Sequence, residues 1–356
     1  MDVATTDDDG PGRRVELALG KRIEREGYDL FFFRKQTEFY KVSRPFSRWL
    51  TANLADYDLA HIHALFSFTS TSAARTARRL RIPYVVRPLG VLNRWGTSNR
   101  RPLLKSLSFQ LVERSILHNA AAIHYTSHAE QKEAEEFGAP HGGMVIPLGL
   151  EGQSFYDSPG PDRFWERFPQ AKDRPVILFL SRIHPKKGLD LLLPTFAAVK
   201  KKYPRTVLAV AGSGEAGYVE SLKQKAANLG LATDVLWTGQ LEGVAKLSAF
   251  AAATLYVLPS YSENFGIALV EALGAGVPSV TTTGVAVAEE IRVADAGIVV
   301  EPNATALSSA LDRLLGDSQL REEFRGRSRR LVKERFSAEA MAQSLKALYE
   351  RVLAKN

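Results

Sequence analysis

The chain has 356 residues, a net charge of +8 at neutral pH and no cysteine. This length suits about two domains, and a hydrophobic content of 45% is typical of a globular protein. The absence of cysteine excludes disulfides, thiolate metal sites and a cysteine nucleophile. No apolar run reaches the roughly 18 residues of a spanning helix. Because the polar sequence "MDVATTDDDGPG" at the start is not a secretory signal, we expect a cytoplasmic protein.

The first half of the chain alternates between apolar runs and helical patterns. The runs "YDLAHIHALF", "IPYVVRPLG", "AAIHYTS" and "GMVIPLGLE" predict strands. The segments "TSAARTARRLR", "PLLKSLSFQLVERSILHN" and "AEQKEAEEFG" predict helices. This alternation indicates an α/β domain, which we place at residues 1–152.

Basic residues are concentrated between Ser72 and Ser115, where Glu113 is the only acid. The stretch contains ten cations: Arg75, Arg78, Arg79, Arg81, Arg87, Arg94, Arg100, Arg101, Lys105 and Arg114. One interpretation is an ordinary solvated face. The other is a surface that meets anions, such as lipid headgroups or a diphosphate-bearing acceptor, which would place the protein peripherally at the inner face of a membrane. No nucleic-acid-binding pattern is present, so nucleic acid is not an expected partner.

The second half has a more regular pattern. Strands are predicted at "PVILFLSRI", "TVLAVAGSG", "DVLWTG", "TLYVLPS", "PSVTTTG" and "GIVVEP", with helices between them. These strands are apolar on both faces, which is typical of a buried parallel sheet. We therefore predict a doubly wound domain at residues 174–335, with its ligand at the carboxyl ends of the strands.

A segment rich in Pro, Asp and Gly, "EGQSFYDSPGPDRFWERFPQAKDRP", separates the halves and is predicted to be a linker. Residues 336–356 predict an amphipathic helix with a serine N-cap, which we expect to cross back to the first domain. Two open α/β domains joined in this way would face a central cleft, where ligands usually bind.

Two glutamates stand out in "LPSYSENFGIALVEALGAGVPSV", which runs from Leu258 to Val280. Glu263 lies in a loop ahead of a helix that opens near Gly266, and a helix amino terminus suits phosphate. Gly266 also allows a ligand to approach the backbone. Glu271, more than a turn into the helix, can accept hydrogen bonds from a ribose diol. The alternative is a capping acid and a solvated helix glutamate.

Two further loops follow predicted strands. "FLSRIHPKKGLD" places Arg182 and Lys187 where a guanidinium and an ammonium can bind phosphate oxygens. "VAGSGEAG" places Gly212 and Ser213 at another strand end, a weak signal by itself. Surface turns with ordinary residues are the alternative for each loop, but three such loops on one sheet edge favour a site.

With "WTGQL", these motifs resemble the nucleotide-sugar half of the retaining glycosyltransferases of family four, which have the two-domain GT-B fold and an E-x7-E signature. The first half resembles the same family through "YDLAHIHAL", "PYVVRPLGVLNRW" and "AAIHYTSHAEQKEAEEFG". The resemblance implies two doubly wound Rossmann-like domains and a nucleoside-diphosphate sugar donor.

The resemblance also implies roles for individual residues. Arg182 and Lys187 would hold the donor diphosphate, Glu263 would contact the donor sugar, and these three form the expected catalytic group. Glu271 would bind the ribose. The remaining expected donor-binding residues are Gly212, Ser213, Gly239, Leu241, Asn264, Phe265, Gly266 and Ile267.

The chain departs from the family at two places. Leu89 stands where many members have a histidine near the donor sugar. Arg87 can compensate, and His61 and His63 alternate on one strand face, so His63 and Arg87 are candidate sugar or acceptor contacts. Buried structural histidines are the alternative, and no catalytic base is assigned. The beginning resembles the second strand of the family, so we expect a strand–loop–helix to be missing before Met1, which would leave the activity of this chain open.

The resemblance implies a hexosyl transfer from a UDP- or GDP-sugar onto a lipid-linked or polysaccharide acceptor. No cofactor or metal is expected, because Arg and Lys supply positive charge to the departing diphosphate. The alternative is a catalytically impaired sugar-nucleotide-binding or scaffold protein of the same pathway.

Overall fold

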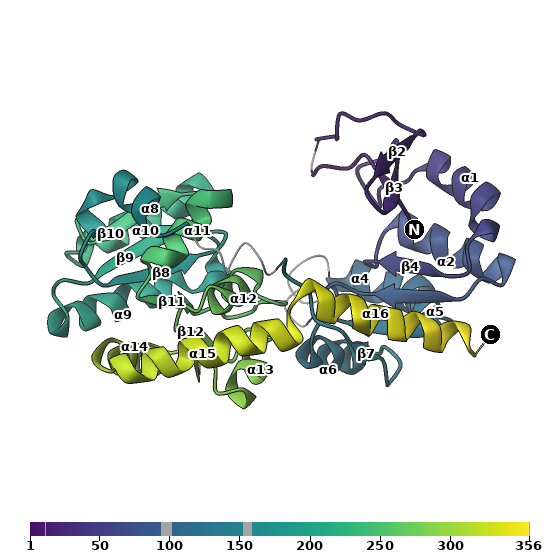
Figure 1. Cartoon of the computed structure of the whole chain (residues 1–356). Coiled ribbons are helices and arrows are strands. Elements are labelled where there is room, and N and C mark those ends of the chain that lie inside the picture. The colour runs from purple at the N-terminus through teal and green to yellow at the C-terminus, as the bar shows by residue number, and fades with distance from the viewer. Residues whose placement is uncertain (11, 94–101, 152–158, 356) are drawn as a thin grey trace. The chain divides into compact units, whose positions relative to one another are not determined.

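The computed structural model describes residues 1–10, 12–93, 102–151 and 159–355. The chain divides into two compact units, as Figure 1 shows by colour along the chain. Met1–Ile146 and Ser344–Asn356 form the first unit, and Pro147–Gln343 forms the second. Both units contain parallel sheets with helices, so the predicted α/β class with two Rossmann-like sheets is confirmed.

The second unit is built on a six-stranded sheet in the order β10-β9-β8-β11-β12-β13. Every pairing in it is parallel. Its strands are β8 (Val176–Leu180), β9 (Val207–Ala211), β10 (Val235–Gly239), β11 (Leu255–Leu258), β12 (Ser279–Thr282) and β13 (Ile298–Val300). The central strands are buried along nearly their whole length, because helices cover both faces. All six strands lie at the predicted runs.

Among the described residues of this unit, one helix precedes the first strand, helices lie between the strands, and two follow the last strand. They are α8 (Asp162–Arg167), α9 (Leu189–Lys202), α10 (Ala216–Asn228), α11 (Gly243–Ala252), α12 (Ile267–Gly274), α13 (Ala288–Val293), α14 (Ala304–Gly316) and α15 (Ser318–Arg335). We did not predict α14 and α15. The predicted terminal helix is α16 (Ala338–Leu353), and its residues from Ser344 onward belong to the first unit.

Helix α8 lies inside the segment predicted as a linker. Phe164 of this helix is buried in the core of the second unit, and its backbone N–H donates to Ser248 Oγ at 3.0 Å. The described part of the segment after residue 158 is therefore packed structure, because Ala171 is also buried in this core and Trp165 and Phe168 pack against it. Residues 152–158 lie outside the described residues.

The first unit contains two sheets. One has the order β1-β3-β2 and the other β4-β5-β6-β7. The strands are β1 (Asp2–Thr6), β2 (Arg22–Arg25), β3 (Tyr28–Phe33), β4 (Ala60–His63), β5 (Tyr84–Arg87), β6 (Ala122–Tyr125) and β7 (Met144–Val145). The four strands of the second sheet match the predicted runs.

The smaller sheet was only partly predicted. β1 pairs in parallel with β3, whereas β2 runs antiparallel to β3. The sequence of β2, "RIER", is mostly exposed and lacks apolar alternation, so its pattern does not indicate a strand. β1 and β4 are edge strands of separate sheets, and no pairing between these sheets occurs within the described residues.

The helices of the first unit are α1 (Arg44–Asn53), α2 (Phe68–Leu80), α4 (Pro102–Ser108), α5 (Arg114–His118) and α6 (His128–Phe137). A π-helical turn, Phe109–Glu113, joins α4 to α5, so the helix predicted over 102–119 is continuous as far as His118. Within the part of the chain that is described, no helix is long and apolar enough to cross a bilayer.

Candidate functional site

The loops predicted to bind a ligand meet at one edge of the six-stranded sheet. β8 lies between β9 and β11, so the strand order reverses beside it. In open parallel sheets this reversal leaves a crevice at the carboxyl ends of the strands. Arg182 follows β8, Gly212 follows β9, and Glu263 follows β11, so the topology brings these loops together. The backbone N–H of Tyr261 donates to Lys186 O at 2.8 Å and ties two of the loops.

A cavity of about 720 Å³ lies at this edge, entirely within the second unit. Ten of the twelve residues predicted for the donor line it: Arg182, Gly212, Ser213, Leu241, Glu263, Asn264, Phe265, Gly266, Ile267 and Glu271. Its lining also includes Ser181, Gln240, Glu242 and Lys246, which the sequence patterns did not single out. Lys187 and Gly239 are not among the residues described as lining it.

Lys187 forms an ion pair with Glu263, which lines the cavity. It ends a short 3-10 turn, Pro185–Lys187, and only 7% of the residue is exposed. Arg182, by contrast, is exposed at the cavity wall. Both cations lie in the loop after β8 as predicted, but the side chain of Lys187 is buried against Glu263.

Two opposing effects act on the pKa of Lys187. Burial, together with the positive charges of Lys186 and Arg182, lowers the pKa of Lys187 to about 8. The ion pair with Glu263 opposes this by favouring the charged ammonium. An added anion beside Lys187 and Arg182 would favour the charged form further, so this corner of the site suits a phosphate.

Glu271 lies on α12 and faces the same cavity. Its carboxylate accepts a hydrogen bond from Lys246 Nζ at 2.7 Å, and 12% of its side chain is exposed. Lys246 comes from α11, so the pair joins two helices that flank β11. The carboxylate keeps a second oxygen that can accept from a ligand hydroxyl. Nothing in the local sequence of Lys246 marks it, since only the helix packing brings it to Glu271.

The backbone at the start of α12 depends on Gly266. Its φ of 91° lies in the left-handed region, and a Cβ there would come 3.2 Å from Val285 Cγ1. No side chain among the described residues caps the amino terminus of this helix. The cavity therefore meets a helix end whose N–H groups and dipole favour an anion.

The loops after β9 and β10 are bonded to each other. Gly212 N–H donates to Gly239 O at 2.9 Å, and the Ser213 hydroxyl donates to Gln240 Oε1 at 3.2 Å. A Cβ on Gly212 would collide with the carbonyl of Ser181, so the three strand ends need glycine to approach this closely. Gly239 thus supports the wall, while Leu241 lines the cavity.

The two other candidate contacts lie in the first unit. His63 ends β4, Arg87 ends β5, and they are register partners. The ring of His63 stacks on His61 with centroids 4.4 Å apart. Arg87 is 9% exposed, and burial lowers the pKa of its guanidinium. Their proposed contact with sugar or acceptor stays a prediction.

A chain of hydrogen bonds that sequence reasoning missed runs behind His63. His124 Nε2 bonds to Ile146 O at 2.9 Å, His124 Nδ1 lies 3.4 Å from His61 Nε2, and His61 Nδ1 lies 2.8 Å from the Tyr349 hydroxyl. Because the carbonyl oxygen of Ile146 can only accept, His124 donates to it from Nε2. His61 then donates to His124, and the Tyr349 hydroxyl donates to His61. This order requires both histidines to be neutral. The chain fastens α16 to the sheet of the first unit.

No group of three or more His, Asp or Glu side chains that could hold a metal ion occurs among the described residues. The positive groups at the cavity are instead Arg182, Lys187 and Lys246. The arrangement can bind a ligand that carries phosphates and a diol.

Family models match most of the chain. Residues 1–149 match the model described as "Glycosyl transferase 4-like domain", and residues 162–331 match "Glycosyl transferases group 1". Both matches agree with the resemblance drawn from the motifs.

Curated relatives are similar over part of their length. A GDP-mannose-dependent alpha-(1-6)-phosphatidylinositol monomannoside mannosyltransferase of Mycolicibacterium smegmatis is 30% identical over 216 residues, which are 57% of this chain and 55% of the relative. A phosphatidyl-myo-inositol mannosyltransferase of the same organism is 29% identical over 212 residues, 59% of this chain and 52% of that protein. The chain spans about half the length of the curated relatives that it matches.

Solved structures share the fold. HepE of Anabaena in complex with UDP and glucose superposes with a TM-score of 0.75 at 20% identity, over 90% of this chain and 86% of that one. Sucrose-phosphate synthase from Thermosynechococcus elongatus gives 0.75 at 22% identity, over 100% and 89% of the two chains. At these identities the likeness establishes a common architecture for both units.

Proposed function

We propose that this chain moves a sugar from a nucleoside-diphosphate sugar onto a lipid-linked or polysaccharide acceptor with retention of configuration. Its family matches and its architecture support a GT4-type glycosyltransferase of the GT-B fold. The donor is a UDP- or GDP-sugar. The curated relatives act on phosphatidylinositol-based acceptors by their names, and HepE was solved with UDP and glucose, which supports a nucleotide donor and a lipid acceptor.

One observation carries the proposal. The cavity at the carboxyl edge of the six-stranded sheet gathers Arg182, the amino terminus of α12 and the carboxylates of Glu263 and Glu271. A guanidinium and a helix end suit phosphates, whereas carboxylates suit sugar hydroxyls. The four features therefore match the two ends of a nucleotide sugar.

We assign the roles from the chemistry and the partners of each side chain. Glu271, held by Lys246, accepts from the ribose hydroxyls. Arg182 binds the diphosphate, and Lys187 adds positive charge from behind Glu263. Glu263 accepts from the sugar hydroxyls and, with Asn264 to Ile267, borders the reacting carbon.

The reaction itself breaks the bond between the sugar and the diphosphate. Negative charge grows on the leaving diphosphate, and positive charge grows on the sugar ring. Arg182 and the helix dipole stabilise the first, and the carboxylate of Glu263 stabilises the second. We propose that the transfer needs no metal, because the chain's own cations face the phosphates.

A second candidate function is sugar-nucleotide binding without transfer. Two observations favour it: Leu89 takes the place of an expected histidine, with a positive φ of 58°, and the sheets of the first unit are separate. In that case the second unit would bind the donor normally, while the first would not complete the reaction.

Calorimetry with UDP and GDP, followed by donor hydrolysis and transfer assays with the matching sugar nucleotides, tests the proposal. Binding of one nucleoside diphosphate together with turnover of its sugar conjugate is the expected result. Binding without turnover would support the second candidate. If neither nucleotide binds, both functions are overturned.

A further inference from the structure

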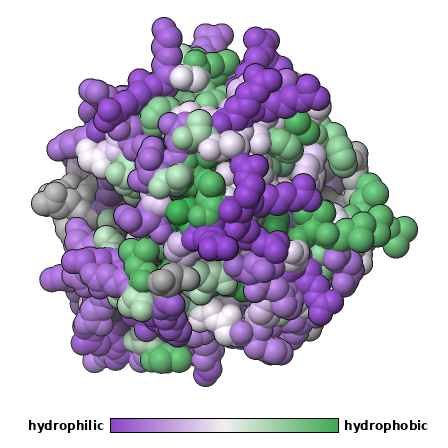
Figure 2. Space-filling view, turned by 90° about the vertical axis from the view of Figure 1, so that its right-hand side faces the viewer, coloured by the Kyte–Doolittle hydropathy of each residue, from purple (hydrophilic) through white to green (hydrophobic). Residues whose placement is uncertain are grey.

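Four leucines of the first unit point to solvent from a single helical segment. Leu103, Leu104, Leu107 and Leu111 are 84%, 54%, 57% and 70% exposed. They lie on α4 and the π-helical turn after it, with spacings that place them along one face of a helix. We call them the leucine stripe. Figure 2 shows one face of the molecule, on which hydrophilic groups prevail and hydrophobic groups lie among them. Adjacent exposed apolar side chains of this size are typical of an interaction site.

Cations from α2 border the leucine stripe. Arg75 and Arg78 line a small cavity of about 220 Å³ together with Leu111 and Val112. Arg78 Nη1 donates to Ser115 Oγ at 3.2 Å, so its guanidinium lies against α5. Positive charge and exposed leucine therefore share one face of the unit.

This face presents no exposed carboxylate from its own elements. Between residues 68 and 118 the only acid is Glu113, whose exposure is 0%. The hydroxyls of Tyr40 and Ser108 donate to it at 3.1 and 3.4 Å, while burial raises its pKa. Helix α1, which packs on α2, contains no acid either. Residues 94–101, which include three of the arginines noted in the sequence, lie outside the described residues.

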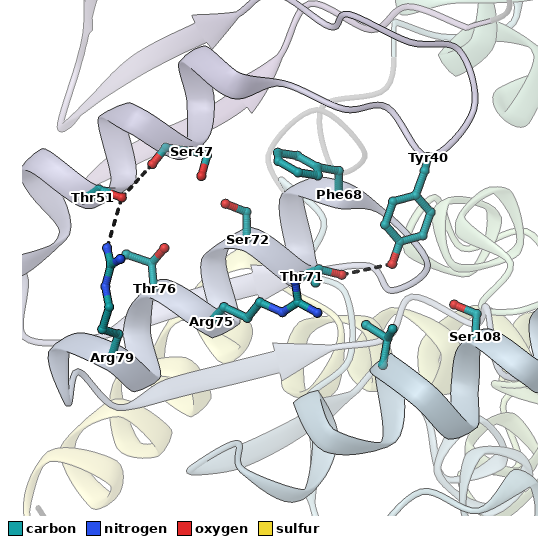
Figure 3. A pocket seen from close by; sticks show the side chains of 11 residues that line it. Tyr40, Ser47, Thr51, Phe68, Thr71, Ser72, Arg75, Thr76, Arg79 and Ser108 are labelled. Carbon is teal, nitrogen blue, oxygen red and sulfur yellow. Dashed lines mark hydrogen bonds between the residues drawn. The ribbon is translucent and has the colours of Figure 1, made fainter.

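A larger cavity adjoins the small one and is lined by guanidinium and hydroxyl groups. It has a volume of about 500 Å³ and shares Thr71, Arg75 and Val112 with its neighbour. Figure 3 shows Arg75 and Arg79 of α2 beside it, with Ser47 and Thr51 of α1 on the other side. Arg79 Nη2 donates to Thr51 Oγ1 at 3.2 Å. Guanidinium and hydroxyl donors together suit a phosphate.

We propose that this face docks on a bilayer that contains anionic phospholipid. The leucine stripe enters the interface, and Arg75, Arg78 and Arg79 contact the lipid phosphates. One of these phosphates binds at the larger cavity. The combination of apolar insertion and cationic contact is what interfacial helices use, and either component alone binds weakly. The inference concerns the surface of the first unit and does not rest on the donor chemistry of the second.

Fluorescence gives a direct test, because the chain contains no cysteine. Leu107→Cys creates a single attachment point for a polarity-sensitive dye on the leucine stripe. Leu229→Cys, at a leucine of the second unit that is 38% exposed, is the matched control. With vesicles of phosphatidylcholine and phosphatidylglycerol, we expect a blue shift at position 107 and none at 229. No shift at 107, or equal shifts at both positions, would overturn the proposal.

Vesicle flotation of the full chain separates the two components. Replacing Leu103, Leu107 and Leu111 by Ser should reduce binding to anionic vesicles at low and high salt. Arg75→Gln with Arg78→Gln should reduce it by about 25-fold, chiefly at low salt, since each charge near the surface contributes about fivefold. Leu229→Ser and Lys223→Gln should bind like the unaltered chain.

Several outcomes contradict the proposal. Equal binding to pure phosphatidylcholine vesicles would show that lipid charge is irrelevant, and unchanged binding of the leucine variant would show that the stripe does not insert. Binding to soluble polyglutamate but not to vesicles would assign the face to an acidic protein instead.

Discussion

Lys187 and Glu263, both predicted to act on the same ligand, form an ion pair with each other. The ammonium is nearly buried, and 18% of the glutamate side chain is exposed. The pair links the loop after β8 to the loop after β11 across the point where the strand order reverses. It therefore holds the two walls of the cavity together as well as placing charge there.

A double-mutant cycle on this pair should reveal strong coupling. Glu263→Gln leaves the Lys187 ammonium without its carboxylate, which we expect to cost about 1–3 kcal/mol of unfolding free energy. Lys187→Met combined with Glu263→Gln should cost less than the sum of the single changes. Urea unfolding of the four proteins gives the coupling. Strictly additive losses would mean that the pair does not stabilise the fold.

Arg182→Ala should weaken binding without unfolding the protein. The guanidinium is exposed at the cavity wall, so its removal leaves no buried gap. We expect nucleoside-diphosphate affinity to fall by about 1.5–3 kcal/mol, the range for a hydrogen bond to a charged group, and turnover to fall with it. Calorimetry and thermal melting measure the two effects. Arg330→Ala, at an exposed position of α15, is the control, and a melting temperature that drops while affinity holds would make Arg182 structural.

Glu271→Ala should abolish the preference of the protein for a nucleotide with an intact ribose over one that lacks the ribose hydroxyls. The unaltered chain should bind a nucleoside diphosphate more tightly than its 2′,3′-dideoxy analogue, by about 1.5–3 kcal/mol. In the variant the two should bind equally, because the carboxylate that accepts from the diol is gone. Glu220→Ala on α10 should keep the difference. A difference that survives in Glu271→Ala rules out the ribose assignment.

The histidines of the first unit should make its stability depend on pH. Burial lowers the pKa of His124 to about 4 and that of His61 to about 2, with further lowering from neighbouring histidines and Arg87. Between these values and the ordinary pKa of ~6.5, the unfolded chain binds protons that the folded chain does not. Stability therefore falls as the pH falls below ~6.5. His124, which is 1% exposed, should alone account for about 2 kcal/mol between pH ~6.5 and ~5.

Thermal unfolding at several pH values checks this dependence. His124→Asn should be less stable at neutral pH but should show a flatter decline on acidification, whereas His128→Asn, at an exposed position, should behave like the unaltered chain. A His124 variant with the same slope as the original would contradict the role of the buried histidine.

Hydrogen exchange should differ between the units. β8 pairs on both sides in a six-stranded sheet, whereas β1 and β4 are edge strands of smaller sheets. Amides of Asp2–Thr6 and Ala60–His63 should therefore exchange faster than those of Val176–Leu180. Equally slow exchange in all three strands would show that the first unit is as stable as the second.

The sequence alone predicted the six strands of the second unit, and most of the residues predicted for its site line the cavity. Apolar strands such as "VILFL" identify a buried parallel sheet whatever their order, and loops after such strands converge because parallel strands end at one edge. The same pattern predicts Arg182, Gly212, Glu263 and Glu271 as site residues. It also found β4 to β7, whose runs are apolar.

Only the tertiary structure decided which side chains meet. Lys246 reaches Glu271, and Tyr349 reaches His61, because strand order and helix packing bring distant residues together. Neither pairing leaves a mark in the local sequence. The polar strand β2 and the packed helix α8 were missed for the same physical reason: periodicity records the burial of a segment's own side chains, whereas its partners depend on how the whole chain folds.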